Sequence, residues 1–129
     1  MKSSPLNPSD SPSVSSPREN PCFTTDPTIA ALDVFADDGI SYLLPYAQFL
    51  YAERTPNPAL EKEPDAPPEK MLIHFARADV IVLGSGLKRL ENEIQKYELK
   101  FVKSADRRLA AVLNTHVSTV AITITKEAA

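Results

Sequence analysis

The sequence predicts an α+β fold, a small and mainly antiparallel sheet of about five strands with one main helix packed on a face. Three observations support this class. Short apolar runs rich in β-branched and aromatic residues alternate with turn signals, as in antiparallel sheets. One segment, near residues 87–98, repeats apolar residues at spacings of three and four, the period of a helix. A length of 129 residues, 43% of them hydrophobic and 24% charged, fits one domain.

The first 28 residues differ in composition from the rest of the chain. They contain six of the 12 prolines and seven serines, with few large apolar side chains. Such a segment cannot bury enough surface to offset an ordering cost of about 1–2 kcal/mol per residue. We therefore expect a disordered tail over residues 1–28, with three Ser-Pro pairs as candidate phosphorylation sites, and a single domain over residues 29–127.

The first half of this domain predicts a hairpin and an edge strand. Residues 29–35 and 40–44 flank the turn ADDG, in which Gly39 can adopt a positive φ. Residues 45–54 (PYAQFLYAER) fit a helix that starts at Pro45 or a strand, and we favour an edge strand. The polar, Pro-rich residues 55–70 predict a mobile acidic loop.

The second half predicts a hairpin, the main helix and two more strands. The runs MLIHFA (71–76) and VIVL (80–83) predict a hairpin with one strand central in the sheet, followed by strands near 99–103 and 117–125. Residues 105–114 fit either a short helix, with Leu109, Val112 and Leu113 facing inward, or a strand. The helix should bury one face and expose another, with Leu87, Leu90, Ile94 and Tyr97 inside and Arg89, Glu93 and Lys96 outside.

Two glycines around a serine, Gly84-Ser85-Gly86, join the predicted strand 80–83 to the helix. They are too close together for a phosphate-binding P-loop. The order strand, glycine turn, helix, strand, with Asp106 where a ribose-binding acid would lie, matches a dinucleotide-binding unit, but Arg89 occupies the third glycine position. The favoured interpretation is therefore structural: the glycines turn the chain and Ser85 caps the helix. Nucleotide binding by this turn is the weaker alternative.

Basic residues suggest an anion or nucleic-acid site. Residues 1–69 carry four basic and 11 acidic side chains, whereas residues 70–129 carry ten and six. Such an asymmetry can mark a basic surface for an acidic partner, but we favour neutralisation of the basic half by the acidic half of the same molecule. Lys88 and Arg89 lie in the first helical turn, where the helix dipole disfavours cations. Either they bind an anion, or nearby acids or solvent relieve the repulsion, which is the interpretation we favour. A second basic segment surrounds Tyr97 and Phe101, which could stack bases if they do not face the core. The candidate residues are Ser85, Gly86, Lys88, Arg89, Lys100, Lys103, Arg107 and Arg108.

The sequence contains no pattern of residues that indicates catalysis. His74 and His116 have no spacing that unites a nucleophile, a base and an orienting group, and two histidines are thin support for a metal site. The single cysteine, Cys22, lies in the predicted tail and has no partner for a disulfide. We expect neither a catalytic residue, nor a metal, nor a cofactor.

These observations predict a non-enzymatic protein-association module. A small core and unpaired strand edges favour a homo-oligomer or another protein partner, with Phe49, Leu50 and Tyr51 as the candidate interface. Nucleic-acid binding by the basic residues is the alternative. No apolar run approaches the roughly 20 residues of a membrane span, and the polar N-terminus lacks the core of a signal peptide, so we expect a cytoplasmic protein.

Overall fold

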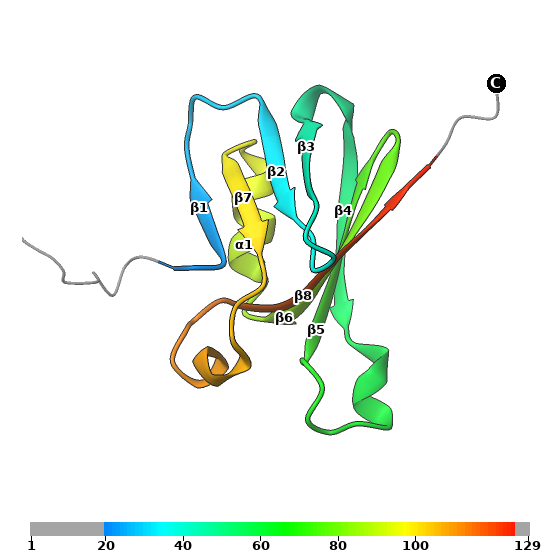
Figure 1. Ribbon diagram of the computed structural model, residues 1–129, viewed down its shortest axis with the longest axis vertical. Coiled ribbons are helices and arrows are strands. Elements are labelled where there is room, and N and C mark those ends of the chain that lie inside the picture. Colours follow the sequence, from blue (N-terminus) through cyan, green and yellow to red (C-terminus); the bar gives the residue numbers. More distant parts are fainter. Residues whose placement is uncertain (1–19, 126–129) are drawn as a thin grey trace, which may run out of the picture.

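The computed structural model describes residues 20–125 as two four-stranded sheets and one α-helix around a single core (Figure 1). The first sheet contains, in spatial order, β1 (Phe23–Thr25), β7 (Leu99–Lys103), β2 (Ala31–Phe35) and β3 (Ser41–Pro45). The second sheet contains β4 (Phe49–Pro56), β5 (Glu69–Phe75), β6 (Ala78–Ser85) and β8 (His116–Ile124). The helix is α1 (Lys88–Gln95), and three 3-10 helices are η1 (Tyr46–Gln48), η2 (Pro58–Glu61) and η3 (Arg107–Ala111).

The first sheet is mixed. The predicted hairpin of β2 and β3 is confirmed, with Gly39 at φ +92° in its turn. The turn is further fixed by Asp38, whose side chain accepts a hydrogen bond of 2.9 Å from the Ile40 N–H. β7 runs parallel to β2 and antiparallel to β1, so segments far apart in the sequence form the middle of this sheet.

The second sheet is antiparallel throughout. The predicted hairpin of β5 and β6 is confirmed, and both strands are central. β4 lies at one edge, as favoured for residues 45–54, and is preceded by the short η1 turn after Pro45. β8 forms the other edge, with an irregular register beside Gly84.

The helix completes the core between the two sheets. Leu87, Leu90 and Ile94 are buried, as their spacing predicts, and join one cluster with residues of both sheets. The outward position expected for Glu93 is wrong: its side chain is buried and forms ion pairs with Arg89 and Lys96. α1 contacts β4 of the second sheet and β7 of the first. Where the chain passes from β3 to β4, Tyr46 donates its hydroxyl to the Leu99 carbonyl at 2.6 Å, which ties this crossing to the first sheet.

The α+β class is confirmed, but the expectation of about five strands in one sheet is wrong. The described residues form eight strands in two sheets. The chain crosses between the sheets at η1, between β6 and β7, and between β7 and β8. Alternation of apolar and polar residues indicates which side chains face inward, but not which sheet a strand joins.

The predicted boundary of the tail at residue 28 is wrong for residues 20–28. β1 pairs with β7, and Cys22 and Phe23 are buried in the core. The Cys22 sulfur accepts a hydrogen bond of 3.2 Å from the Val117 N–H, and Asn20 donates to the Thr115 carbonyl at 2.8 Å. Residues 1–19, with the three Ser-Pro pairs, and residues 126–129 lie outside the described part of the chain.

Two segments differ from the prediction in detail. The Pro-rich loop is shorter than residues 55–70, because β4 continues to Pro56 and β5 begins at Glu69. Buried Asn57 closes this loop, donating its backbone N–H to Pro68 and its side-chain amide to Pro67. Residues 105–114, left open as helix or strand, contain η3, and Val112, expected to face inward, is 73% exposed.

Between residues 20 and 125, no helix combines the length and apolar character needed to cross a membrane.

Candidate functional site

The glycine bend lies against the backbone at the start of β8. A Cβ atom on Gly84 would overlap the carbonyl oxygen of His116, and one on Gly86 would overlap that of Asn114. Gly86 also adopts φ +63°, a conformation that side chains disfavour. Thr115 donates its hydroxyl to the Gly86 carbonyl at 2.8 Å. The two glycines therefore allow a close approach of backbones that no other residue type permits.

The expected cap by Ser85 is wrong. Ser85 is the last residue of β6, and α1 begins after Leu87 without a side-chain cap from its own N-cap residue. Instead, Glu69 of β5 accepts a hydrogen bond of 2.9 Å from the Leu87 N–H. A carboxylate of the protein itself therefore occupies the N-terminus of the helix, where its charge suits the helix dipole.

The topology also contradicts a dinucleotide-binding unit. That unit requires two neighbouring parallel strands joined by a helix. Here β6 and β7, on either side of α1, lie in different sheets. The Gly84-Ser85-Gly86 turn therefore does not form the strand-helix-strand arrangement on which the nucleotide alternative depends.

Acidic residues neutralise the two cations at the start of α1. Lys88 pairs with Glu91 at 3.1 Å, and Arg89 pairs with Glu93 at 3.1 Å. The Arg89 guanidinium also lies 5.2 Å from the centre of the Phe23 ring. Lys88, which donates a hydrogen bond, and Arg54 on β4 lower the pKa of Glu91. These pairs offset the unfavourable position of the cations, in line with the favoured interpretation.

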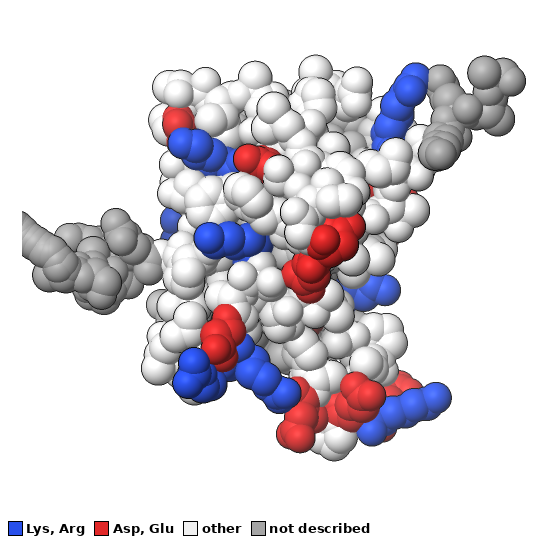
Figure 2. Space-filling model, in the orientation of Figure 1, with Lys and Arg blue, Asp and Glu red and all other residues white. Residues whose placement is uncertain are grey.

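The remaining predicted cations lie on other elements. Lys100 and Lys103 belong to β7, whereas Arg107 and Arg108 belong to η3. Arg108 pairs with Asp106 at 3.0 Å, and this pairing lowers the pKa of Asp106. On the side of the molecule shown in Figure 2, basic and acidic groups are interspersed. The structure therefore spreads the six predicted cations over three elements, α1, β7 and η3.

The two aromatic residues of the basic segment have different environments. Tyr97 was expected on the buried face of the helix but is 47% exposed. It follows the helix at φ +59°, and its ring stacks on that of Tyr46 with centroids 4.9 Å apart. Phe101 is half-buried and meets Phe35 edge to face at 5.6 Å.

A groove of about 740 Å³ lies over the glycine bend. The Pro-rich loop forms one wall and η3 the other, and Gly84, Ser85, His116 and Thr119 contribute to its lining. Both walls project from the same end of the sheets in Figure 1. Arg107 of η3 and the acids Glu63 and Asp65 of the loop line opposite sides, so the groove carries both signs of charge.

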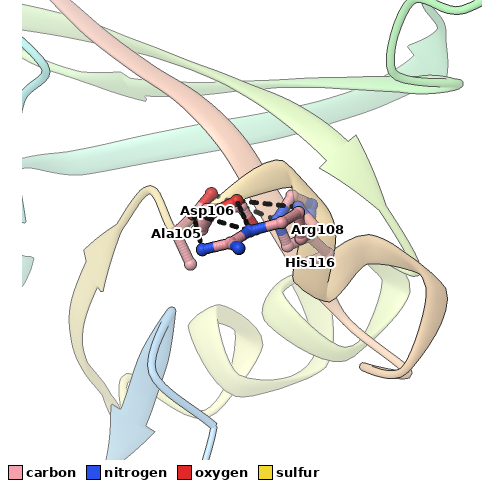
Figure 3. A network of polar contacts seen from close by, with 4 residues as sticks. All are labelled: Ala105, Asp106, Arg108 and His116. Carbon is pink, nitrogen blue, oxygen red and sulfur yellow. Dashed lines mark hydrogen bonds and ion pairs between the residues drawn. The ribbon is translucent and has the colours of Figure 1, made fainter.

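His116 has a structural role at this groove. Its Nε2 atom lies 3.0 Å from the Asp106 carbonyl and 3.2 Å from that of Ala105, as Figure 3 shows. Because both partners are acceptors, Nε2 carries the proton and donates to them. His116 therefore ties β8 to the segment that leads into η3.

His74 lies on the outer face of the second sheet. Its Nδ1 atom is 2.9 Å from Asp79, its Nε2 atom is 3.8 Å from Glu53, and the ring of Tyr51 stacks on it at 4.3 Å. Among residues 20–125, no group of three or more His, Cys, Asp or Glu side chains is arranged to hold a metal ion.

The three predicted interface residues differ in exposure. Leu50 is 60% and Tyr51 is 51% exposed on the edge strand β4. Phe49 is only partly accessible, because it packs on the core and meets Phe75 edge to face at 5.7 Å. Leu50 and Tyr51 can therefore contact a partner, while Phe49 mainly supports the fold.

The structure also reveals residues that the sequence analysis missed. Glu69, which caps α1 from another strand, had no local signal. Leu43 and Phe35 are exposed on the first sheet, and their alternation with buried Leu44 and Val34 could have indicated an outward position.

Comparison with family models, curated proteins and solved structures finds no match to this chain.

Proposed function

We propose that the protein is a non-enzymatic association module that forms homo-oligomers through the edge and outer face of its second sheet. The observation that carries this proposal is the exposure of Leu50 and Tyr51 on β4, whose outer edge has no strand beside it within the described chain. An unpaired edge with exposed apolar side chains favours pairing with another chain.

The neighbouring strands extend this apolar surface. In the register of the second sheet, Tyr51 lies beside His74, and Leu72 of β5 lies beside Ile81 of β6. Leu72 and Ile81 are only half-buried. Charged residues, including Glu53 and Asp79, lie around them, and an apolar centre with a polar rim is typical of protein interfaces.

The roles of the histidines support a function without catalysis. His116 holds two backbone carbonyls, and His74 contacts Asp79 beneath the Tyr51 ring. Neither contact includes a serine, threonine or cysteine that a histidine could activate as a nucleophile.

The proposal is tested by the double variant Leu50→Ser, Tyr51→Ser, with Phe49 kept. Sedimentation equilibrium should show an oligomer for the wild-type chain and at most half its mass for the variant, because two apolar anchors are lost. Val112→Ser is the matched control, since Val112 is even more exposed but lies beyond η3, and the mass of this variant should equal that of the wild type. An unchanged mass for the double variant would reject this interface.

A further inference from the structure

The outer face of the first sheet also exposes apolar residues. Leu43 is 69% and Phe35 is 38% exposed, and Phe101 lies against Phe35. The register aligns Leu43 of β3, Asp33 of β2 and Phe101 of β7 in one row across the sheet. We call Phe35, Leu43 and Phe101, with Asp33 and Lys103, the first-sheet face.

The charges on this face have both signs. Lys103 lies beside Phe35 in the register, and its ammonium group is 5.7 Å from the centre of the Phe101 ring. Asp33 lies between Leu43 and Phe101. A nucleic acid favours a surface of one sign, because every phosphate is negative. A surface with both signs can instead face a copy of itself, with each lysine opposite a carboxylate.

We propose that the first-sheet face is a second self-association surface, on which another copy of this chain packs around a two-fold axis. Phe35, Leu43 and Phe101 would form the apolar centre, and Lys103 of one copy would face Asp33 of the other. This inference rests on the proposed function, self-association, and adds to it a second interface that is separate from the one at β4. Two different two-fold interfaces build a tetramer when their axes intersect at right angles.

The size of the face sets the expected strength. Four strands about 4.8 Å apart and about five residues long cover roughly 19 by 17 Å. This area, roughly 320 Å² per copy, is below the roughly 800 Å² per partner of a standard specific interface, so association through this face should be weak and transient. Measurements must therefore cover a range from about one to several hundred micromolar.

The test is the sedimentation of Leu43→Asp beside the wild-type chain. Because Leu43 is the most exposed apolar residue of the face, a charge there should leave the fold intact and block packing. We expect this variant to have half the wild-type mass, and Val112→Asp, the matched control, to keep the wild-type mass. Phe35→Ser is a second variant with the same expected result, and far-ultraviolet circular dichroism checks that each variant is folded.

Combining the variants separates this inference from the proposed function. If Leu43→Asp keeps the wild-type mass, the second surface is wrong, whatever Leu50→Ser, Tyr51→Ser does. If only Leu43→Asp lowers the mass, the first-sheet face stands and the β4 interface is wrong. When both surfaces act, each variant should give a dimer and their combination a monomer of 14.1 kDa.

A nucleic acid is the competing occupant of this face. Titration with a labelled single-stranded oligonucleotide at low salt tests this occupant. We expect no binding that depends on Lys103, so Lys103→Glu should give the same titration as the wild type. Binding that this substitution lowers tenfold, and that salt abolishes, would overturn the proposal in favour of a nucleic-acid surface.

Discussion

At the scale of single residues, Gly39 and Gly86 differ in the space around their Cα atoms. Gly39 and Gly86 both have a positive φ, but the space around Gly39 is open, whereas Gly86 faces the Asn114 carbonyl. Gly39→Ala should lower the free energy of unfolding by about 1 kcal/mol, because alanine is strained in this backbone conformation. Gly86→Ala adds a steric overlap and should cost about 3 kcal/mol or more in the free energy of unfolding.

Urea unfolding of these two variants measures the difference directly. Equal losses for both would show that the close approach at the bend contributes nothing. Sequence analysis identified the bend as structural from its glycines, but it could not reveal that the contact is with residues 114–116, because that contact is tertiary.

Two buried groups, the Cys22 thiol and the Tyr46 hydroxyl, predict how the free energy of unfolding depends on pH. Burial raises the pKa of the Cys22 thiol above its ordinary value of 9.0, and burial also raises that of the Tyr46 hydroxyl above 10.0. The folded state therefore holds these protons more tightly than the unfolded state. Their contribution to stability is complete below about pH 9 and is lost as pH rises, by up to about 1.4 kcal/mol per pH unit for each group.

Chemical unfolding between pH 7 and pH 11 tests this dependence. In Cys22→Ala, the decline should begin about one pH unit higher, near the onset for Tyr46 alone. The same decline in the wild type and in Cys22→Ala would contradict a role for the thiol. The sequence analysis placed Cys22 in a disordered segment, because the prolines around it predict disorder and the strand beside it has only three residues.

At the scale of the elements, α1 depends on a residue from another strand. Glu69 at the start of β5 accepts the hydrogen bond of the Leu87 N–H. Glu69→Ala should destabilise the protein by about 1 kcal/mol, as for other lost helix caps. Glu69→Gln keeps an acceptor oxygen without the charge and should lose less.

Thermal unfolding compares these variants with Glu61→Ala, a change at an exposed acid in η2. A loss for Glu69→Ala no greater than for Glu61→Ala would show that the helix needs no cap from β5. The helical periodicity predicted α1 well, including its buried residues Leu90 and Ile94. It placed the end too late because Tyr97, at an apolar spacing, adopts a left-handed conformation that ends the helix.

Strand prediction succeeded where alternation was strong and local turns joined neighbours. Both hairpins and the edge position of β4 followed from the sequence. The parallel pairing of β2 with β7 did not, because residues about 70 positions apart carry no local signal for each other.

At the scale of the whole molecule, two sheets around one core leave their outer faces with exposed apolar side chains. Leu50 and Tyr51 lie on the second sheet, and Leu43 and Phe35 on the first. Sequence analysis located the first pair, since residues 49–51 form a compact apolar run. It missed the second, because a single expected sheet offered no separate face for β3. The charge composition suggested a basic second half, but ion pairs such as Lys88 with Glu91 neutralise part of that charge locally.

The most direct test of self-association is the mass of the unmodified 129-residue chain in solution, measured by sedimentation equilibrium as its concentration rises. A mass that increases from 14.1 kDa to a fixed multiple of that value is the result we predict. A mass that stays at 14.1 kDa up to several hundred micromolar would contradict it.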